Sequence, residues 1–326
     1  MKKRQLSNKQ KNNIKNREIK IKEEVNLNSN REKAIVITRY GNTAKVKTET
    51  KQTVVVNLKR TTDQIVTGDQ VIIEFEDNYK EGKIIATLER NNELSRPYQK
   101  TKKIIAANID QMLIVNSINP KISLSILDNY LIAAESLKIN PVIIINKIDL
   151  CSAKELQEIK KDMQIYQNIG YDILYYSNKT KDCRYKRDNI LEKIIDKSNI
   201  LVGQSGVGKS TIIKEIFPEI DIKIQEISKK SNLGRHTTTY STLFEIEKGG
   251  SIIDSPGIRE FKIGNIPKEE IANLYRDFQP YIKNCKFRNC NHINPPNCGI
   301  KEALKNKEIS EKRYNNYIKI HENTKQ

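Results

Sequence analysis

Residues 200–211 read ILVGQSGVGKST, and this stretch decides the fold. An apolar run, expected to be a strand, leads into the spacing G-x-x-x-x-G-K-[ST], and the following TIIKEIF (211–217) predicts a helix. In such a unit the backbone N–H groups and the helix N-terminus face phosphate oxygens, and a lysine adds a point charge. The residues predicted to bind a nucleotide here are Gly203, Gln204, Ser205, Gly206, Val207, Gly208, Lys209, Ser210 and Thr211.

Apolar runs alternate with helix-like segments on both sides of this loop. Buried strands are predicted over 111–115, 141–145, 172–176, 199–202 and 251–254, and helices over 122–137, 153–170 and 188–197. The alternation predicts an α/β domain on a largely parallel sheet, with ligands at the carboxyl ends of the strands.

A second motif, NKID (146–149), directly follows the apolar run PVIII. The Asp149 carboxylate can accept hydrogen bonds from both N1–H and the exocyclic amine of guanine, a donor pair that adenine lacks. Ser177, directly after DILYY, is placed for the loop that closes over the base. Alone, NKID is a common surface tetrapeptide. Together with the phosphate loop, Asn146, Lys147, Asp149 and Ser177 predict GTP.

A third motif is D-x-x-G at the end of SIID, formed by Asp254 and Gly257. Asp254 can hold Mg²⁺ through water, and the N–H of Gly257 can sense the γ-phosphate. Ser210 and one threonine of GRHTTT (234–239) are expected to ligate Mg²⁺. The leading choice is Thr238, while Thr237 and Thr239 stay open.

The order of these motifs is unusual. In ordinary small GTPases the phosphate loop comes first and NKxD late, whereas here NKID and Ser177 precede the phosphate loop, and D-x-x-G comes last. A circularly permuted sheet keeps the same site geometry if the old termini can be joined. The γ-phosphate sensor is then connected directly to the segment after Gly257.

The position after D-x-x-G holds Ile258, where Ras-like enzymes place a water-orienting glutamine. An isoleucine cannot orient water, so another residue must do it. We predict that His236, directly before the threonines, is catalytic as a neutral imidazole, although a histidine merely exposed on a loop is the alternative. Intrinsic hydrolysis is expected to be slow until a partner orders the site.

Four residues with metal-ligand chemistry fall within 14 positions in the pattern C-x4-C-x-H-x5-C: Cys285, Cys290, His292 and Cys298. Three thiolates and one imidazole complete a tetrahedral shell for one structural zinc ion, with no open position for catalysis. The alternative is a set of unligated cysteines. Basic and aromatic neighbours, and a helix expected over 301–319, suit contact with RNA or a solvated surface.

The segment before the α/β domain has a different texture. Residues 1–32 are predicted to form a basic flexible tail, followed by five short Val/Ile/Thr-rich runs between 34 and 94 and a linker over 91–97. These runs predict a small closed barrel of OB type, which either binds oligonucleotides or only packs. The fold class is thus multidomain α+β: an OB-type β-barrel (33–96), a circularly permuted P-loop α/β GTPase domain (97–264) and a helical zinc-binding domain (265–326).

The composition narrows the class of partner. The 326 residues include 58 Lys and Arg against 40 acids, a formal charge of +18, which favours nucleic acid as a partner, although the chain is rich in Lys, Ile and Asn throughout. No run of about 18 apolar residues is present, so neither a membrane span nor a membrane partner is expected. The basic start lacks the apolar stretch of a secretory signal. Five cysteines, an odd number, suit a reducing compartment.

The chain closely resembles the ribosome small subunit-dependent GTPase A family, also called RsgA, YjeQ or EngC. The resemblance covers about residues 34–315 and rests on GQSGVGKST, GRHTTT, IIDSPGIREF, NIDQMLIV, VIIINKIDL and CKFRNCNHINPPNCGI. It implies binding to the small (30S) ribosomal subunit and its rRNA, and hydrolysis of GTP to GDP and phosphate that the subunit stimulates. It also implies a role in late maturation and assigns the catalytic histidine to His236. Asn129 departs from the arginine that is usual there.

Two other functions stay open besides a subunit-dependent GTPase. One is an RNA-binding structural module in which the nucleotide only stabilises the fold. The other is phosphoryl transfer to another acceptor, which NKID and the lack of an acceptor-activating carboxylate disfavour. We expect a monomer in the cytoplasm, or in an organelle stroma if the protein belongs there.

Overall fold

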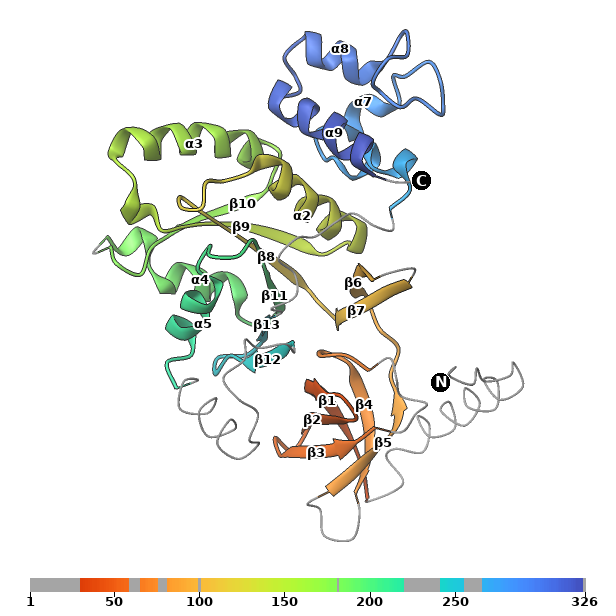
Figure 1. Cartoon of the computed structure of the whole chain (residues 1–326), viewed down its shortest axis with the longest axis vertical. Helices are drawn as coiled ribbons and strands as arrows, with labels where there is room; N and C mark the ends of the chain where they lie inside the picture. Colours follow the sequence, from red (N-terminus) through yellow and green to blue (C-terminus); the bar gives the residue numbers. More distant parts are fainter. Residues whose placement is uncertain are drawn as a thin grey trace. The chain divides into compact units, whose positions relative to one another are not determined.

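The computed structural model describes residues 30–58, 65–75, 81–98, 101–180, 182–219, 241–254 and 266–324 (Figure 1). The chain divides into two compact units. The first contains the described residues within Met1–Ser95, Ile104–Ile109 and Thr238–Phe244. The second contains those within Arg96–Lys103, Asp110–Thr237 and Glu245–Gln326.

Five strands of the first unit close into a barrel: β1 (Arg31–Tyr40), β2 (Thr43–Thr48), β3 (Thr53–Asn57), β4 (Gln70–Phe75) and β5 (Glu81–Thr87). They pair in the ring β1-β2-β3-β5-β4-β1, with β3–β5 parallel and the other pairs antiparallel. Along β2 every second residue is buried, because alternate side chains of a strand point to one face. The predicted OB-type barrel is confirmed, and its first strand begins at Arg31.

The barrel core is made of branched and small apolar side chains. Val36 faces Val46 across β1 and β2, and Ile73 faces Ile84 across β4 and β5. All four are at most 2% exposed. A further strand of this unit, β12 (Thr242–Glu245), pairs antiparallel with β1 at Thr38 and Thr242.

The prediction of a linker over 91–97 is wrong. Residues of this stretch lie in β6 (Glu93–Tyr98), which pairs with β7 (Thr101–Ala107) in a two-stranded sheet. Both strands of such a ribbon are edge strands. Each pairs on one side only, so a residue without an N–H group, such as Pro97, is tolerated where the backbone faces away from the partner strand.

The second unit contains the predicted parallel sheet, in the order β10-β9-β8-β11-β13. Its strands are β8 (Gln111–Ser117), β9 (Asn140–Asn146), β10 (Asp172–Tyr176), β11 (Ser198–Val202) and β13 (Ser251–Asp254). Every residue of β8 is buried, as a strand covered on both faces requires. Parallel pairing places the carboxyl ends of all five strands at one edge, where the sequence motifs begin.

Helices connect these strands: α2 (Leu124–Leu137), α3 (Ala153–Asn168), α4 (Arg187–Ile194) and α5 (Lys209–Ile216), with short 3-10 turns η3 (Ile148–Leu150) and η4 (Cys183–Tyr185). The start of α3 is a capping box, in which Ser152 Oγ accepts from the N–H of Glu155 and the Glu155 carboxylate accepts from the N–H of Ser152. No helix in the described ranges is long and apolar enough to cross a membrane.

The C-terminal segment belongs to the same compact unit and consists of η5 (Lys268–Glu270), η6 (Ala272–Leu274), α7 (Gln279–Ile282), α8 (Gly299–Lys305) and α9 (Glu311–Asn323). Tyr275 stacks on Phe278 at 4.7 Å and meets the edge of Tyr317 at 5.6 Å, and all three are buried. Ile132 of α2 completes this core, so the segment packs on the α/β sheet domain through that helix.

Candidate nucleotide and metal sites

The predicted phosphate loop runs from the end of β11 to the start of α5. At two of its positions only glycine fits, because atoms of other segments lie where a side chain would be. Gly203 has φ +143°, and a Cβ there would lie 2.2 Å from the Val115 carbonyl oxygen. Gly208 has φ +96°, and a Cβ there would lie 2.3 Å from Nδ2 of Asn146. Only glycine combines this backbone conformation with this closeness.

Asn146 fastens the end of β9 to the phosphate loop. Its Nδ2 donates to the Val207 carbonyl oxygen at 2.8 Å, and its Oδ1 accepts from the N–H of Lys147 at 2.7 Å. Asn146 is 4% exposed, so the loss of either bond would leave a buried polar group unsatisfied.

Lys147 adds a second link to the same loop. Its backbone is left-handed at φ +61°, and Nζ donates to the carbonyl oxygens of Gly206 and Asn119, each at 2.6 Å. The structure therefore brings NKID and the phosphate loop together. The contact with Asn119 was not predicted, because a backbone carbonyl leaves no signal in a motif.

Asp149 and Ser177 come together at the ends of β9 and β10. Ser177 Oγ donates to Asp149 Oδ1 at 2.5 Å, and Ser177 is buried. The hydroxyl also accepts from the N–H of Lys179 at 3.1 Å. This pair orients the carboxylate, and a carboxylate so held can accept hydrogen bonds from the two adjacent donors of guanine.

A small open pocket beside Ser177 was not predicted from the sequence. It is lined by Tyr176, Ser177, Asn178, Thr180, Lys186, Arg187 and Glu215. Burial raises the pKa of Tyr176 to about 12, so this phenol stays neutral. Its charged lining consists of two cations, Lys186 and Arg187, and one carboxylate, Glu215.

Lys209 and Asp254 lie at the phosphate end of the site. Lys209 Nζ donates to the carbonyl oxygens of Gly203 and Gln204, at 2.7 and 2.8 Å. Burial raises the pKa of Asp254, and the positive charge of Lys209 opposes that shift. Ser210 is the second residue of α5, directly after Lys209, and hydroxyl and carboxylate oxygens are the ligands that Mg²⁺ prefers.

Three predicted site residues, His236, Thr238 and Gly257, lie outside the described residues, as do the alternatives Thr237 and Thr239 and the neighbouring Ile258. The other predicted nucleotide-site residues lie at the carboxyl edge of the sheet, in NKID, at Ser177, in the phosphate loop, at the start of α5, and at Asp254.

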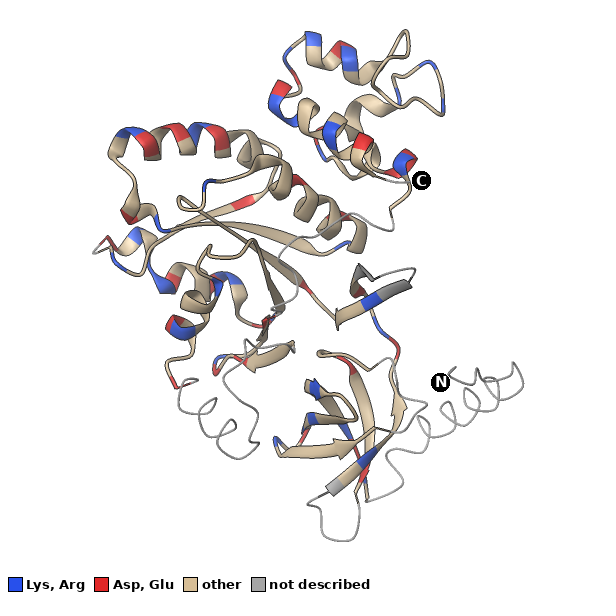
Figure 2. Cartoon of the chain, viewed as in Figure 1, with Lys and Arg blue, Asp and Glu red and all other residues tan. Residues whose placement is uncertain are grey.

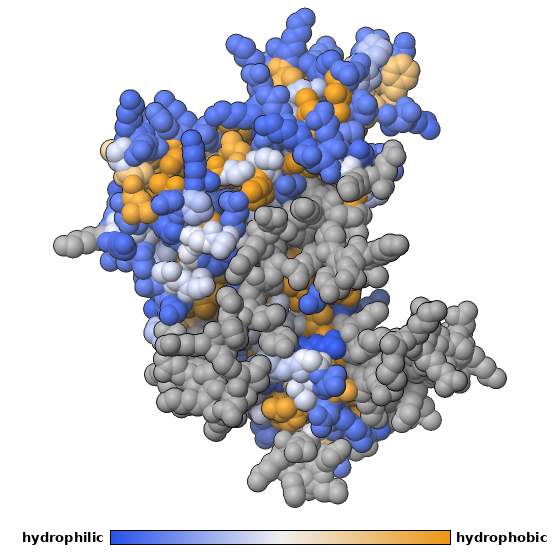
Figure 3. All heavy atoms as spheres, viewed as in Figure 1, coloured by the Kyte–Doolittle hydropathy of each residue, from blue (hydrophilic) through white to orange (hydrophobic). Residues whose placement is uncertain are grey.

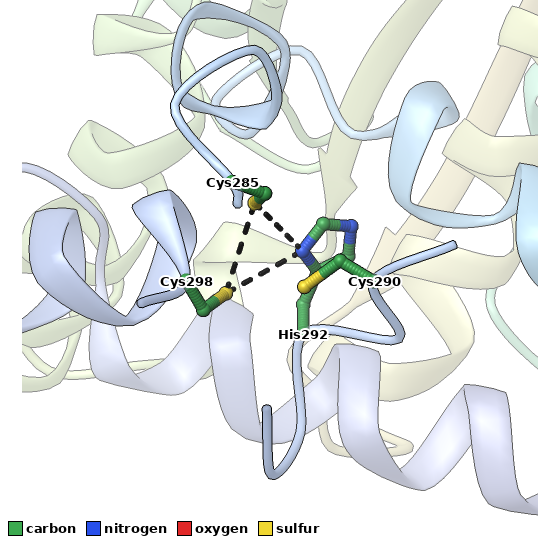
Figure 4. Close-up of side chains that lie close together, drawn as sticks. All are labelled: Cys285, Cys290, His292 and Cys298. Carbon is green, nitrogen blue, oxygen red and sulfur yellow. Dashed lines mark hydrogen bonds between the residues drawn. The ribbon is translucent and has the colours of Figure 1, made fainter. Parts of the chain in front are cut away.

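The four predicted metal ligands also come together (Figure 4). One ligand atom from each of Cys285, Cys290, His292 and Cys298 lies within 4.8 Å of the other three. His292 Nδ1 is 3.5 Å from Sγ of both Cys285 and Cys298, and these two sulfurs are 3.9 Å apart.

These spacings fit a tetrahedral zinc ion. Bonds of about 2.3 Å to sulfur and about 2.0 Å to nitrogen would separate two sulfurs by about 3.8 Å and sulfur from nitrogen by about 3.5 Å. Burial lowers the pKa of His292, which favours the neutral imidazole that binds metal. In the described ranges these four residues are the one cluster of three or more His, Cys, Asp or Glu side chains that could hold a metal ion.

Helices α8 and α9 position the metal site. Cys298 is the N-cap residue of α8, and a Cβ on the next residue, Gly299, would lie 2.3 Å from the Tyr281 carbonyl oxygen. The hydroxyl of Tyr314 donates to the carbonyl oxygen of His292, and that of Tyr317 to the carbonyl oxygen of Asn291, both at 2.8 Å. Helix α9 therefore fixes the backbone of the ligand loop.

Comparison with known proteins adds to this geometry. Residues 87–264 match the family model described as "RsgA GTPase". A "Small ribosomal subunit biogenesis GTPase RsgA 1" of Vibrio vulnificus (strain YJ016) is 45% identical over 294 residues, covering 88% of this chain and 82% of the relative. The "Small ribosomal subunit biogenesis GTPase RsgA" of Actinobacillus pleuropneumoniae (serotype 5b) is 43% identical over 293 residues, which cover 89% of this chain and 84% of that relative.

Two solved structures have the same fold as this chain. The crystal structure of YjeQ from Thermotoga maritima superposes with a TM-score of 0.73 at 31% identity, covering 89% of this chain and 97% of that one. The structure of YloQ, described as a circularly permuted GTPase, gives 0.70 at 27% identity, covering 90% and 94%. The chain therefore belongs to the RsgA GTPase family and is a circularly permuted GTP hydrolase.

Proposed function

We propose that this chain binds the small ribosomal subunit and hydrolyses GTP there during the biogenesis of that subunit. The descriptions of its relatives support this role. The single observation that carries the nucleotide part is the contact of Asn146 and Lys147 with the phosphate loop, next to an Asp149 carboxylate held by Ser177. That arrangement suits one guanine nucleotide bound across the carboxyl edge of the sheet.

The residues take the following roles in this proposal. Residues 203–211 hold the phosphates, and Asn146, Lys147, Asp149 and Ser177 hold the base. Ser210 and Thr238 ligate Mg²⁺, which neutralises charge on the phosphates, while Asp254 holds it through water and Gly257 senses the γ-phosphate. His236 orients the attacking water in place of the missing glutamine. Because that task waits for a partner, the subunit stimulates hydrolysis.

The domain scheme follows the same proposal. Residues 33–96 form the barrel, 97–264 the GTPase domain and 265–326 a zinc domain, with a basic tail before them. Zinc is structural here, since four protein ligands fill its shell. We also place the protein in the cytoplasm as a monomer, in keeping with a soluble ribosomal partner.

Charge and exposure support contact with rRNA. The chain carries a formal charge of +18, and Lys and Arg are spread over both units and along α8 and α9 (Figure 2). Between the ligands Cys285 and Cys290, residues 286–289 are exposed, and Lys286 Nζ lies 5.8 Å from the centre of the Phe287 ring. On the face drawn in Figure 3 the C-terminal helices are mainly hydrophilic. Cations beside an exposed ring suit phosphates and an unpaired base.

GTP turnover with and without purified small subunits tests the proposal. Phosphate release is measured for the parent, for Lys209→Ala and for His236→Ala, with large subunits as the control particle. We expect the small subunit alone to stimulate the parent, and neither variant to be stimulated. An unstimulated parent would remove the ribosomal role.

A structural RNA-binding module makes a different prediction. In that case Lys209→Ala would abolish nucleotide binding yet leave association with the subunit and release from it unchanged. Sedimentation of the subunit with the parent or with this variant, in GTP analogue or GDP, distinguishes the two functions.

A further inference from the structure

Arg313 of α9 is a buried cation between the C-terminal helices and the sheet domain. It is 2% exposed, and its Nη1 donates to Oδ1 of Asp128 on α2. On its other side Nη2 and Nε donate to the two carboxylate oxygens of Asp277, at 2.8 and 3.2 Å. The guanidinium therefore bridges two acids from different segments, one of them by a two-point contact that fixes its plane.

The acid on α2 accepts hydrogen bonds from side chains of two other helices, α9 and α3. Asp128 is fully buried, and besides Arg313 it accepts from Asn316 Nδ2 of α9 at 2.8 Å and from the hydroxyl of Tyr166 of α3 at 2.9 Å. The guanidinium also lies 4.3 Å from the ring centre of Tyr275 and 5.2 Å from that of Tyr166. All these contacts are inside the second unit.

Such a network is better suited to orientation than to stability. Burying an ion pair costs desolvation that its attraction only partly offsets, and apolar side chains of similar volume often serve equally well. The two-point contact with Asp277 instead fixes the plane of the guanidinium. Arg313 Nη1 and Asn316 Nδ2 then meet the two carboxylate oxygens of Asp128, which favours one relative arrangement of α9 and α2. Lys312, the neighbour of Arg313, also bonds to the sheet domain, at Asp162 of α3, but this pair is exposed and contributes little.

The same helix α2 begins beside the nucleotide site. Its N-cap is Ser123, and the loop before it contains Asn119, whose carbonyl oxygen accepts from Lys147 Nζ. That ammonium also binds the Gly206 carbonyl oxygen in the phosphate loop. The helix has 14 residues, a length of about 21 Å, and Asp128 lies in its second turn.

At the other end, α9 holds the metal loop through Tyr314 and Tyr317. A continuous set of bonds and rigid helices therefore joins two sites. It runs from the phosphate loop through Lys147, the Asn119 loop, α2, Asp128 and Arg313 to α9 and the carbonyl oxygens of His292 and Asn291.

We propose that Arg313 is a positioning residue that couples the metal loop to the guanine-recognition motif through α2. A nucleotide that binds NKID and the phosphate loop thereby stabilises the positions of α2 and α9. A partner bound at the metal loop changes the affinity of the nucleotide site in turn, because coupling is reciprocal. The second half of this statement rests on the proposed ribosomal function, whereas the first does not.

The test uses zinc-loaded full-length protein and two conservative variants. Asp128→Asn keeps the shape and removes the charge, and Arg313→Lys keeps the charge and removes the planar fork. Lys312→Ala, which breaks the exposed bond on the same helix, is the matched control. Equal zinc content and an equal affinity for a GTP analogue, within about twofold, establish that each variant is folded.

The first readout is the rate at which a chelating dye removes zinc, with and without the GTP analogue. Zinc release requires local opening of the metal loop, and a ligand bound elsewhere slows it only if the sites are coupled. We expect the analogue to slow release at least about threefold in the parent and in Lys312→Ala, and to have no effect in Asp128→Asn or Arg313→Lys. A parent that shows no slowing, or folded variants that keep it, would overturn the coupling.

The second readout is the ratio of small-subunit affinities in GTP analogue and in GDP. We expect the two network variants to bring this ratio toward one, while the control keeps the parent value. A parent without affinity for the subunit would contradict the ribosomal function but not the zinc result, so the two failures are distinguishable.

Discussion

The side-chain amide of Asn146 donates to the carbonyl oxygen of Val207 across 61 positions of sequence. This bond joins two motifs whose order along the chain is reversed relative to ordinary GTPases. The same amide nitrogen lies 2.3 Å from the position that a Cβ on Gly208 would take. The motifs thus depend on each other sterically as well as through hydrogen bonds.

Gly208→Ala is expected to abolish nucleotide binding. The new methyl group would displace the Asn146 amide, and the site would lose its connection to Val207. Titration with a fluorescent GDP analogue measures the loss.

The control for this change is Gly170→Ala. Gly170 also has positive φ, at +91°, but within the described part of the chain no atom of a non-neighbouring residue lies within 4 Å of a Cβ there. This variant should lose about 1–2 kcal/mol of stability from backbone strain and keep its nucleotide affinity. Equal affinities in the two alanine variants would show that the contact between Gly208 and Asn146 does not matter.

Asp149→Asn is expected to change base selectivity. The amide oxygen of an asparagine can still accept from Ser177. Its NH₂ group, however, is a donor and would face the 2-amino group of guanine, which is also a donor. Xanthine has an acceptor, the 2-oxo group, at that position and would pair with the amide. Affinity for GTP should fall by about 100-fold or more while affinity for XTP rises. Competition against a labelled guanine nucleotide measures both.

The matched variant for base selectivity is Asp162→Asn on α3, an exposed acid whose partner is Lys312. It should leave both affinities unchanged. If Asp149→Asn also preferred GTP, the carboxylate would not read the base.

The sequence specified most of the second unit because its signals are local. A run such as PVIII is so apolar that it must be buried, which indicates a strand in the interior of a sheet. The glycines of 203–208 are needed because the backbone there has a conformation that other residues rarely adopt. The motifs then follow the strands, and parallel pairing brings their ends together. The NKID–phosphate loop contact was therefore predictable, whereas the donation from Lys147 to the backbone of Asn119 was not.

The C-terminal segment was harder to predict because its pattern depends on tertiary contacts. One helix was expected over 301–319, but α8 ends at Lys305, Lys307 adopts φ +63°, and α9 starts after Ser310. Arg313 and Asn316 are charged and polar in the sequence yet buried in the fold. Periodicity assigns such residues to the surface. Their burial is explained by acids that lie far away in the sequence: Asp128 on α2 for both residues, and Asp277 for Arg313.

The barrel offers a prediction on pH. The hydrogen bond from Lys83, at 2.8 Å, and the contact with Arg31, at 3.2 Å, lower the pKa of Glu74 below its ordinary value, against a smaller opposing effect of burial. A lowered folded-state pKa stabilises the fold above the unfolded pKa of about 4.5, and this contribution disappears as the pH falls through the lower folded-state value.

Replacing Glu74 by Gln should therefore destabilise the protein at pH 7 by less than about 1 kcal/mol, because the group is partly exposed. The difference from the parent should vanish as the pH falls through the lowered folded-state pKa of Glu74. Urea unfolding at several pH values measures it, with Glu158→Gln, on the exposed face of α3, as the control. A difference that persists in acid would mean that shape rather than charge matters at Glu74.

Zinc removal gives the last prediction. Cys290→Ser replaces a thiolate by a hydroxyl that binds zinc weakly, so the purified variant should lose its single bound zinc, counted by elemental analysis. In the proposed zinc site the metal would hold the loop to which Tyr314 and Tyr317 are hydrogen-bonded, so its loss should also lower the thermal midpoint and expose Tyr275 and Phe278 to solvent. Cys183→Ser, at an exposed cysteine outside the cluster, should keep both the zinc and the midpoint. Should the Cys290 variant retain a full equivalent of zinc, the four residues would not be its ligand set.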